Sequence, residues 1–373
     1  MAAITLSLTG FRRFSELTTT LDETTILVGP NGVGKTTILE ALYYLSLGRS
    51  YRTTHDRDLV NWETDTFRLV GQFPAARAGS GGVTIERATS FPIGTLPRKR
   101  VTANGVDRSF VASLGLVRVV LFAPELIALI TGAPRERRRY LDAILASLSQ
   151  RYAADLLAYQ HALRQRNALL ASVRQPDAAA YEPWEAALAQ YGTAILTARA
   201  AFSTFLNRYV PEAYVSLVPP SGVRVMSVAY QGTVEDPARF ADLLAARRER
   251  DRLLRATSVG PHRDDLLFQA DGRLAAQTTS RGEQRTLLLA LKQAEIAYLL
   301  ETPAGETGYG PILLLDDMFS ELDAARARQL ARVVGTHQCL ITTTDRTSLP
   351  QALAQQATLL AMEEVLRAPA IAR

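Results

Sequence analysis

The sequence predicts an α/β protein with a phosphate-binding loop on a parallel sheet, an antiparallel β subdomain and an inserted α-helical arm. Three observations support this prediction. Residues 29–36 have the spacing G-x-x-x-x-G-K-T, between an apolar run and a helical pattern. Residues from about 124 to 210 carry apolar side chains at helical spacing, and the last third of the chain alternates strands with helices.

The phosphate-binding loop is the most specific motif in the chain. Its glycines allow successive backbone N–H groups to turn inward onto phosphate oxygens, and the following helix directs its positive end to the same place. Lys35 is one of only three lysines among 42 basic residues, and its compact ammonium suits the β- and γ-phosphates. The residues expected to hold ATP here are Gly29, Pro30, Asn31, Gly32, Val33, Gly34, Lys35, Thr36 and Thr37.

Length and composition describe a globular protein. The chain has 373 residues, enough for two domains, and 47% of them are hydrophobic. No apolar run approaches the length that crosses a bilayer, and the first residues lack a positively charged secretory leader. The single cysteine, Cys339, cannot form an internal disulfide. These features predict a cytoplasmic protein without a membrane segment.

The charge is compatible with a polyanionic partner, since the formal net charge is +5 and the sequence pI is near 9.4. Two dense basic clusters are candidates for contact with DNA backbone phosphates. They are Arg98, Lys99 and Arg100, and Arg135, Arg137, Arg138 and Arg139. The alternative is that these clusters are solvated faces with ion pairs, to Glu136 and Asp142 in the second cluster.

The pattern along the chain predicts three segments. Residues 1–123 form the first half of the nucleotide-binding head, with the phosphate loop and a β-rich subdomain. Residues 124–256 form the helical arm, and residues 257–373 form the second half of the head. The nucleotide would sit at the carboxyl ends of the parallel strands.

Two carboxylates follow the apolar run at 312–315. Asp316 is expected at the carboxyl edge of a buried strand, where it would hold Mg²⁺ together with the Thr36 hydroxyl. Asp317 is placed to orient or deprotonate the water that attacks the γ-phosphate. The alternative is a pair of residues that caps the following helix.

A second anion site is predicted where the long helix after residue 280 begins. Ser280, Gly282 and Gln284 place a hydroxyl and N–H groups at a helix N-terminus. Each chain would then have two phosphate-binding edges for a single nucleotide, which leaves one edge unused. We therefore expect a C₂ dimer in which Ser280 of one copy closes on the γ-phosphate held by the other. Lys35, Asp317 and Ser280 are thus the expected catalytic residues, and helix capping is the alternative for Ser280.

These motifs carry a family resemblance. The loop at 29–36, the S-R-G-E-Q segment at 280–284, the L-D-D strand end and S-E-L-D at 320–323 resemble the ABC-type ATPase head of SMC and related DNA-repair proteins. More narrowly, four further segments resemble the RecF family of bacterial recombination mediators. They are G-R-S-Y-R-T at 48–53, F-A-P-E at 122–125, R-R-R-Y-L-D at 137–142 and G-P-H-R-D-D at 260–265.

The resemblance implies ATP and Mg²⁺ as cofactors, dimerisation on ATP, and slow, DNA-stimulated hydrolysis that acts as a switch. It also implies binding to single- and double-stranded DNA at gaps, and cooperation with RecO and RecR in loading RecA during repair, replication restart and SOS induction. A transporter ATPase subunit and a P-loop kinase or GTPase are the alternatives. The long, basic insert before Ser280 argues against the first, and the motif at Ser280 argues against the second.

Overall fold

The computed structural model describes residues 3–75, 81–92, 96–172, 176–219, 223–302 and 310–367. The chain divides into two compact units, residues 1–126 with 295–373 and residues 127–294. The predicted segment boundary at residue 256 falls inside the second unit. The reason is that β10 (Asp265–Ala270) pairs antiparallel with β9 (Met226–Gln231), which joins segments on both sides of that boundary in one sheet.

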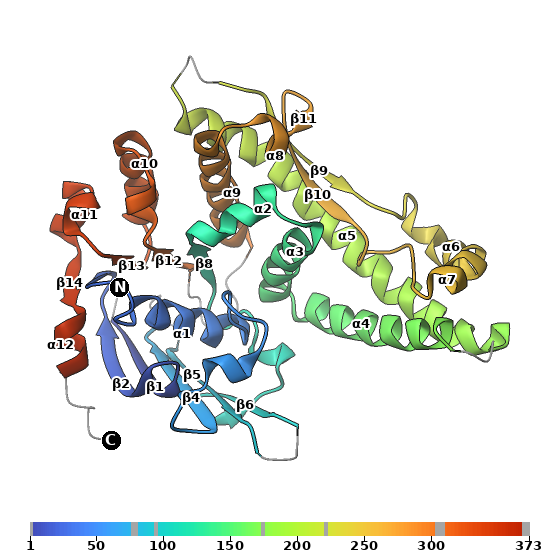
Figure 1. Cartoon of the computed structure of the whole chain (residues 1–373), viewed down its shortest axis with the longest axis horizontal. Coiled ribbons are helices and arrows are strands. Elements are labelled where there is room, and N and C mark those ends of the chain that lie inside the picture. The colour runs from blue at the N-terminus through green and yellow to red at the C-terminus, as the bar shows by residue number, and fades with distance from the viewer. Residues whose placement is uncertain are drawn as a thin grey trace. The chain divides into compact units, whose positions relative to one another are not determined.

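A parallel sheet forms the centre of the first unit. Within the described ranges it has five strands in the order β14-β3-β13-β12-β8. Its strands are β3 (Thr24–Val28), β8 (Val119–Phe122), β12 (Ile312–Asp316), β13 (Cys339–Thr343) and β14 (Thr358–Ala361). Every position of β12 and β13 is buried, as expected for central strands covered on both faces. Figure 1 shows α1 (Lys35–Leu47) on one side of this sheet, and α10 (Ala324–Val334) and α11 (Gln351–Gln356) on the other.

An antiparallel sheet forms the rest of the first unit, in the order β2-β1-β4-β5-β6-β7. Its strands are β1 (Ile4–Phe11), β2 (Phe14–Leu21), β4 (Thr66–Phe73), β5 (Val83–Ser90), β6 (Arg98–Ala103) and β7 (Val106–Asp107). Along β5, buried positions alternate with half-buried ones, so one face of the strand is turned toward the interior. Leu6 of β1, Leu69 of β4 and Leu42 of α1 belong to one hydrophobic core cluster.

The second unit, residues 127–294, takes in most of the segment predicted as a helical arm, residues 124–256, and continues beyond it. Its helices are α2 (Ala128–Thr131), α3 (Pro134–Leu148), α4 (Gln150–Leu170), α5 (Ala178–Leu217), α6 (Phe240–Ala246), α7 (Arg248–Leu254) and α8 (Ala275–Thr278). Helices α4 and α5 pack against each other within this unit (Figure 1). The strands β9, β10 and β11 (Arg273–Leu274) form a small antiparallel sheet, and β9 packs on α5.

A buried arginine links the helices of the arm. Arg166 of α4 donates to Asp251 of α7 at 2.7 Å and to Glu185 of α5 at 3.1 Å, and its side chain is fully buried. A buried charge of this kind is tolerated only when its partners saturate its hydrogen bonds. The arm is therefore held by a specific polar centre as well as by its leucines.

The remaining α-helices are α9 (Arg281–Glu301) and α12 (Met362–Arg367).

Cys339 is buried in β13, and burial raises the pKa of its thiol to about 12, as expected for a core side chain. None of the helices in the described ranges has both the length and the apolar character needed to cross a membrane.

Candidate nucleotide-binding site

The phosphate loop connects β3 to α1, as the motif predicts. Gly32 and Gly34 have φ angles of 77° and 108°, which place them in the left-handed region that favours glycine. A Cβ on Gly34 would lie 2.5 Å from Cζ of Phe14, so no side chain fits there. Helix α1 begins at Lys35, and its first N–H groups therefore face the loop.

Lys35 is held across the loop. Its ammonium donates to the carbonyl oxygens of Gly29 and Pro30 at 2.7 and 2.9 Å. Burial lowers the pKa of Lys35, and the nearby carboxylates of Asp317 and Asp316 oppose that shift. The positive charge of Lys35 is thus in the electrostatic range of both acidic residues predicted for the site.

Asp316 and Thr36 are in direct contact. The Thr36 hydroxyl donates to Oδ1 of Asp316 at 2.9 Å. Thr342, at the end of β13, donates to the same oxygen at 2.8 Å, and the Tyr51 hydroxyl donates to Oδ2 at 3.1 Å. A hydroxyl and a carboxylate are oxygen ligands of the type that Mg²⁺ prefers, so these residues fit a magnesium site completed by phosphate and water.

Asp317 occupies a different environment from its neighbour. Its backbone has a φ of 49°, and its Oδ1 is buried without a hydrogen-bond partner. Burial raises the pKa of this carboxyl above its usual range, and the Ser320 hydroxyl and Lys35 oppose the shift. The Asp317 side chain does not cap the helical turn that follows it, and α10 is capped by Asp323 instead. The capping alternative therefore does not describe Asp317.

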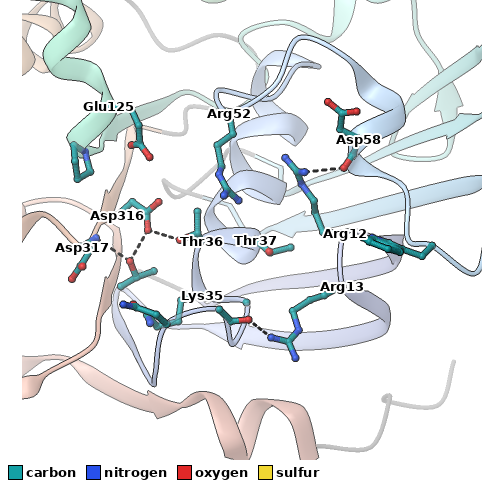
Figure 2. Close-up of a pocket in the computed structure, with 16 residues that line it drawn as sticks. Arg12, Arg13, Lys35, Thr36, Thr37, Arg52, Asp58, Glu125, Asp316 and Asp317 are labelled. Carbon is teal, nitrogen blue, oxygen red and sulfur yellow. Dashed lines mark hydrogen bonds between the residues drawn. The ribbon is translucent and has the colours of Figure 1, made fainter.

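A pocket of about 540 Å³ joins these residues. Figure 2 shows Asp316 and Asp317 on one side of Lys35 and Thr36, with Arg12 and Arg13 on the other. The other residues that line the pocket are Asn31, Gly32, Gly34, Thr37, Arg52, Asp58, Trp62, Pro124, Glu125 and Thr342. The pocket thus has acidic groups near the strand ends and basic groups opposite, which suits a polyanion with a bound cation.

Sequence reasoning missed the arginines of this pocket. Arg12 and Arg13 lie in the tight turn between β1 and β2. Arg12 forms two hydrogen bonds, of 2.9 and 2.7 Å, with the buried carboxylate of Glu40 on α1, and Arg13 donates to the carbonyl of Gly32. The available signal was the adjacent pair of arginines itself, Arg12 and Arg13. The arginine pair precedes the phosphate loop by many residues, so nothing in the local sequence indicated that the two lie close together.

The comparisons with known proteins agree with this geometry. The family model described as RecF/RecN/SMC N terminal domain matches residues 3–365. The DNA replication and repair protein RecF of Streptococcus equi subsp. zooepidemicus (strain MGCS10565) is 35% identical over 357 residues, which cover 93% of this chain and 92% of that protein. The chain belongs to the RecF family.

Two further members support the assignment. The RecF of Streptococcus pyogenes serotype M49 (strain NZ131) is 36% identical over 336 residues and covers 87% of each chain. A solved structure of the recombination mediator protein RecF with ATP, from the RecFOR pathway, has a TM-score of 0.83 at 28% identity and covers 94% of this chain and 93% of that one. The predicted fold class is therefore confirmed. The transporter and kinase alternatives gain no support from these relatives.

Within this RecF-family chain, Ser280 lies in the second unit and immediately precedes the first residue of helix α9. Its backbone N–H donates to the Glu283 carboxylate at 2.7 Å, and its hydroxyl accepts from the Glu283 N–H at 3.3 Å. This reciprocal pair is a capping box. The side-chain amide of Gln284 donates to the carbonyl of Thr279 at 3.2 Å. Helix capping is thus one role of Ser280, and a role toward a second copy stays a prediction.

The two basic clusters differ in how their charges are used. In the first, Arg98, Lys99 and Arg100 are exposed on β6, where Lys99 pairs with Asp56 and Arg100 pairs with Asp107. In the second, Arg137 is buried and forms bonds of 2.7 and 2.8 Å with Asp265.

The other members of the second cluster are held to different degrees. Arg138 donates to the backbone carbonyl of Asp264 at 2.7 Å, and Arg139 donates to Glu136 at 3.5 Å. Arg135 is exposed, and its side chain forms no hydrogen bond or ion pair with the described residues. The proposal of DNA contact therefore rests in this cluster on Arg135, with Arg137 and Arg138 tied to the protein.

The G-P-H-R-D-D segment of the RecF family is part of this structural network. His262 accepts from the Tyr159 hydroxyl at 2.7 Å and donates to the carbonyl of Thr257 at 2.9 Å. Asp264 accepts from the Tyr230 hydroxyl at 2.6 Å. These contacts join α4 and β9 to the segment that precedes β10, so the segment has a structural role within the second unit.

Proposed function

We propose that this protein is an ATP-dependent switch for DNA binding in replication and recombinational repair. The hydrogen bond between Thr36 and Asp316 carries the ATP part of the proposal, because it joins the phosphate loop to the acidic strand end at one pocket. Membership of the RecF family supports the role in DNA replication and repair. The solved RecF with ATP supports ATP as the nucleotide.

The residues of the pocket have separate roles in this proposal. Lys35 and the N–H groups of the loop bind the β- and γ-phosphates. Thr36 and Asp316 hold Mg²⁺, which neutralises phosphate charge when bound. Asp317 orients the attacking water and accepts its proton, for which a half-buried carboxylate with a raised pKa is suited. An aspartate base is one methylene shorter than a glutamate and should hold the attacking water less firmly, so we expect slow hydrolysis. We also expect DNA to stimulate it, as the family resemblance implies.

Dimerisation follows from the second anion site. Ser280 is exposed at the N-terminus of α9, a helix long enough to offer a positive end to phosphate. In the proposed C₂ dimer, Ser280, Gly282 and Gln284 of one copy close on the γ-phosphate held by Lys35 of the other. Nucleotide then decides whether the two copies are together or apart.

DNA and protein partners complete the proposal. Exposed residues Arg98, Lys99, Arg100 and Arg135 contact backbone phosphates of single- and double-stranded DNA at gaps. Since the solved RecF is described as a mediator of the RecFOR pathway, we propose that RecO and RecR act with this protein to load RecA. Repair, replication restart and SOS induction are the proposed contexts, in the cytoplasm.

Molar mass measured by light scattering with ATP, with ADP and without nucleotide tests the proposal. We expect dimers with ATP only. Lys35→Arg is the matched control, because a planar guanidinium keeps the charge but does not fit between two phosphates. This variant should keep part of its nucleotide affinity and stay monomeric. A wild-type protein that binds ATP and remains monomeric at all protein concentrations would contradict the proposal.

A further inference from the structure

A second pocket, of about 430 Å³, lies beside β5 and β6 and shares no residue with the nucleotide pocket. It is bounded by the end of α1, by the two strands and by the segment that follows β7. Four basic side chains line it, namely Arg87, Lys99, Arg100 and Arg108. The proposed ATP site does not account for this gathering of positive charge, and Arg87 and Arg108 have no role in the function proposed above.

Arg87 is the buried member of the group, with only 4% of its surface exposed. Its Nε donates to the carbonyl of Leu45 and its Nη2 donates to the Ser113 hydroxyl, both at 2.9 Å. Its guanidinium lies 5.8 Å from the ring centre of Phe110. Among the described residues, none accepts a hydrogen bond from Nη1, and no carboxylate pairs with Arg87.

The charge on Arg87 therefore lacks a counterion within the described part of the chain. Burial lowers the pKa of Arg87 to about 10, so the guanidinium is still positive at neutral pH. A buried charge is costly unless it is paired. An anion in the pocket would supply the missing partner.

The other cations of the pocket show where the charge is unbalanced. Lys99 and Arg100 are neutralised by Asp56 and Asp107. The Arg108 side chain is exposed and has no polar contact with the described residues. Arg87 at the floor and Arg108 at the rim are thus the two cations of the pocket that have no carboxylate partner among the described residues.

We propose that this pocket binds a phosphate group of the DNA backbone, with Arg87 and Arg108 as its ligands. The inference rests on the proposed function, in which the protein binds DNA. A guanidinium with an open edge is suited to phosphate oxygens. DNA is favoured over a free phosphate because the exposed Arg98 continues the basic surface along β6, where the next phosphates of the same strand would lie.

DNA affinity measured by fluorescence anisotropy over a salt series tests the inference. Arg108→Ser removes an exposed charge without disturbing the core, and Arg87→Gln removes the buried one. Each should weaken binding by about tenfold at low salt. Each should also lower the slope of log affinity against log salt by about 0.9, the value for one lost phosphate contact. Arg332→Ser, an exposed arginine on α10, is the matched control and should behave like wild type.

The outcomes separate this inference from the proposed function. If wild-type protein fails to bind DNA, both are overturned. If it binds DNA and Arg108→Ser binds with the same affinity and salt slope, the pocket is not a DNA site, although DNA binding stands. Thermal stabilisation by inorganic phosphate is measured in parallel. A variant that loses this stabilisation but keeps its DNA affinity identifies a free-anion site and also overturns the inference. Arg108→Ser decides the matter if Arg87→Gln does not fold.

Discussion

The Thr36 hydroxyl donates to the Asp316 carboxylate at 2.9 Å, although the two residues are 280 positions apart in the chain. The contact arises because β3 and β12 flank β13 in a parallel sheet, so that their carboxyl ends meet at one edge. The helical arm is inserted in the sequence between these strands. The part of the pocket expected to hold phosphate and Mg²⁺ therefore needs residues from both the early and the late segments of the chain.

Asp317→Asn should lower ATP turnover by about a hundredfold or more, because an amide cannot accept the proton of the attacking water. ATP binding should persist, and the dimer should accumulate with ATP bound. Wild-type turnover should also fall on acidification, since only the carboxylate form acts as base. Its raised pKa moves this loss to a higher pH than for an ordinary aspartate. Turnover measured against pH checks both effects, and an unchanged rate in the variant would remove Asp317 as base.

Two variants at Ser280 separate helix capping from contact with a second copy. Ser280→Asp keeps an oxygen that caps α9 but places negative charge where the γ-phosphate is expected. Ser280→Arg removes the cap and adds bulk. Both variants should bind ATP as monomers and fail to dimerise. A fluorescent ATP analogue measures the binding, and light scattering measures the molar mass. Loss of ATP binding in the monomer would mean that one chain supplies the whole site. Normal dimerisation of Ser280→Asp would restrict Ser280 to capping.

Arg135 and Arg137 are a matched pair with opposite expected effects. Arg137→Ala leaves Asp265 without its buried partner and should lower the free energy of unfolding by about 3 kcal/mol. Arg135→Ala should change stability by less than about 0.5 kcal/mol. It should, however, weaken DNA binding and lower its salt slope by about 0.9. Urea unfolding and anisotropy measure the two properties. Loss of stability in Arg135→Ala with unchanged DNA binding would contradict the prediction and give Arg135 a structural role.

His262 should make the stability of the second unit depend on pH. Burial lowers its pKa from 6.5 to about 4, while its hydrogen bond to Thr257 opposes the shift. Between these values the unfolded chain binds the proton that the folded protein excludes. Stability should therefore fall as the pH is lowered from about 6.5 to 4, by on the order of 3 kcal/mol.

The variant His262→Gln keeps polar atoms near Tyr159 but does not titrate. The melting temperature of wild type should decrease more steeply than that of the variant over this pH range. Parallel curves would mean that other groups cause the acid sensitivity. His55, which is exposed, provides the control substitution.

Much of the head could be predicted from sequence because its signals are local. The phosphate loop, the apolar run of β12 and the two carboxylates after it are each contiguous, and their order identifies the family. Tyr51 and Thr342 could not be assigned to the site in this way. Their hydroxyls reach Asp316 only through the packing of distant segments. Tyr51 belongs to the G-R-S-Y-R-T segment, but nothing in that segment indicates a contact with Asp316.

The burial of individual arginines in the basic clusters could not be predicted from the sequence. Arg135 and Arg137 belong to the same charged run, and the sequence does not distinguish their environments. On helix α3, two positions along the chain correspond to a large rotation about the axis, so one side chain is exposed and the other is buried.

The sequence by itself determined the fold class, the family and the phosphate loop, because periodicity and motif spacing are properties of neighbouring residues. The tertiary structure alone decided which charges are already neutralised. Arg137 meets Asp265 across 128 positions, whereas Arg87 is buried without a carboxylate among the described residues. Whether a charge is paired depends on which segments pack against it. That packing is set by the whole fold and not by the local sequence.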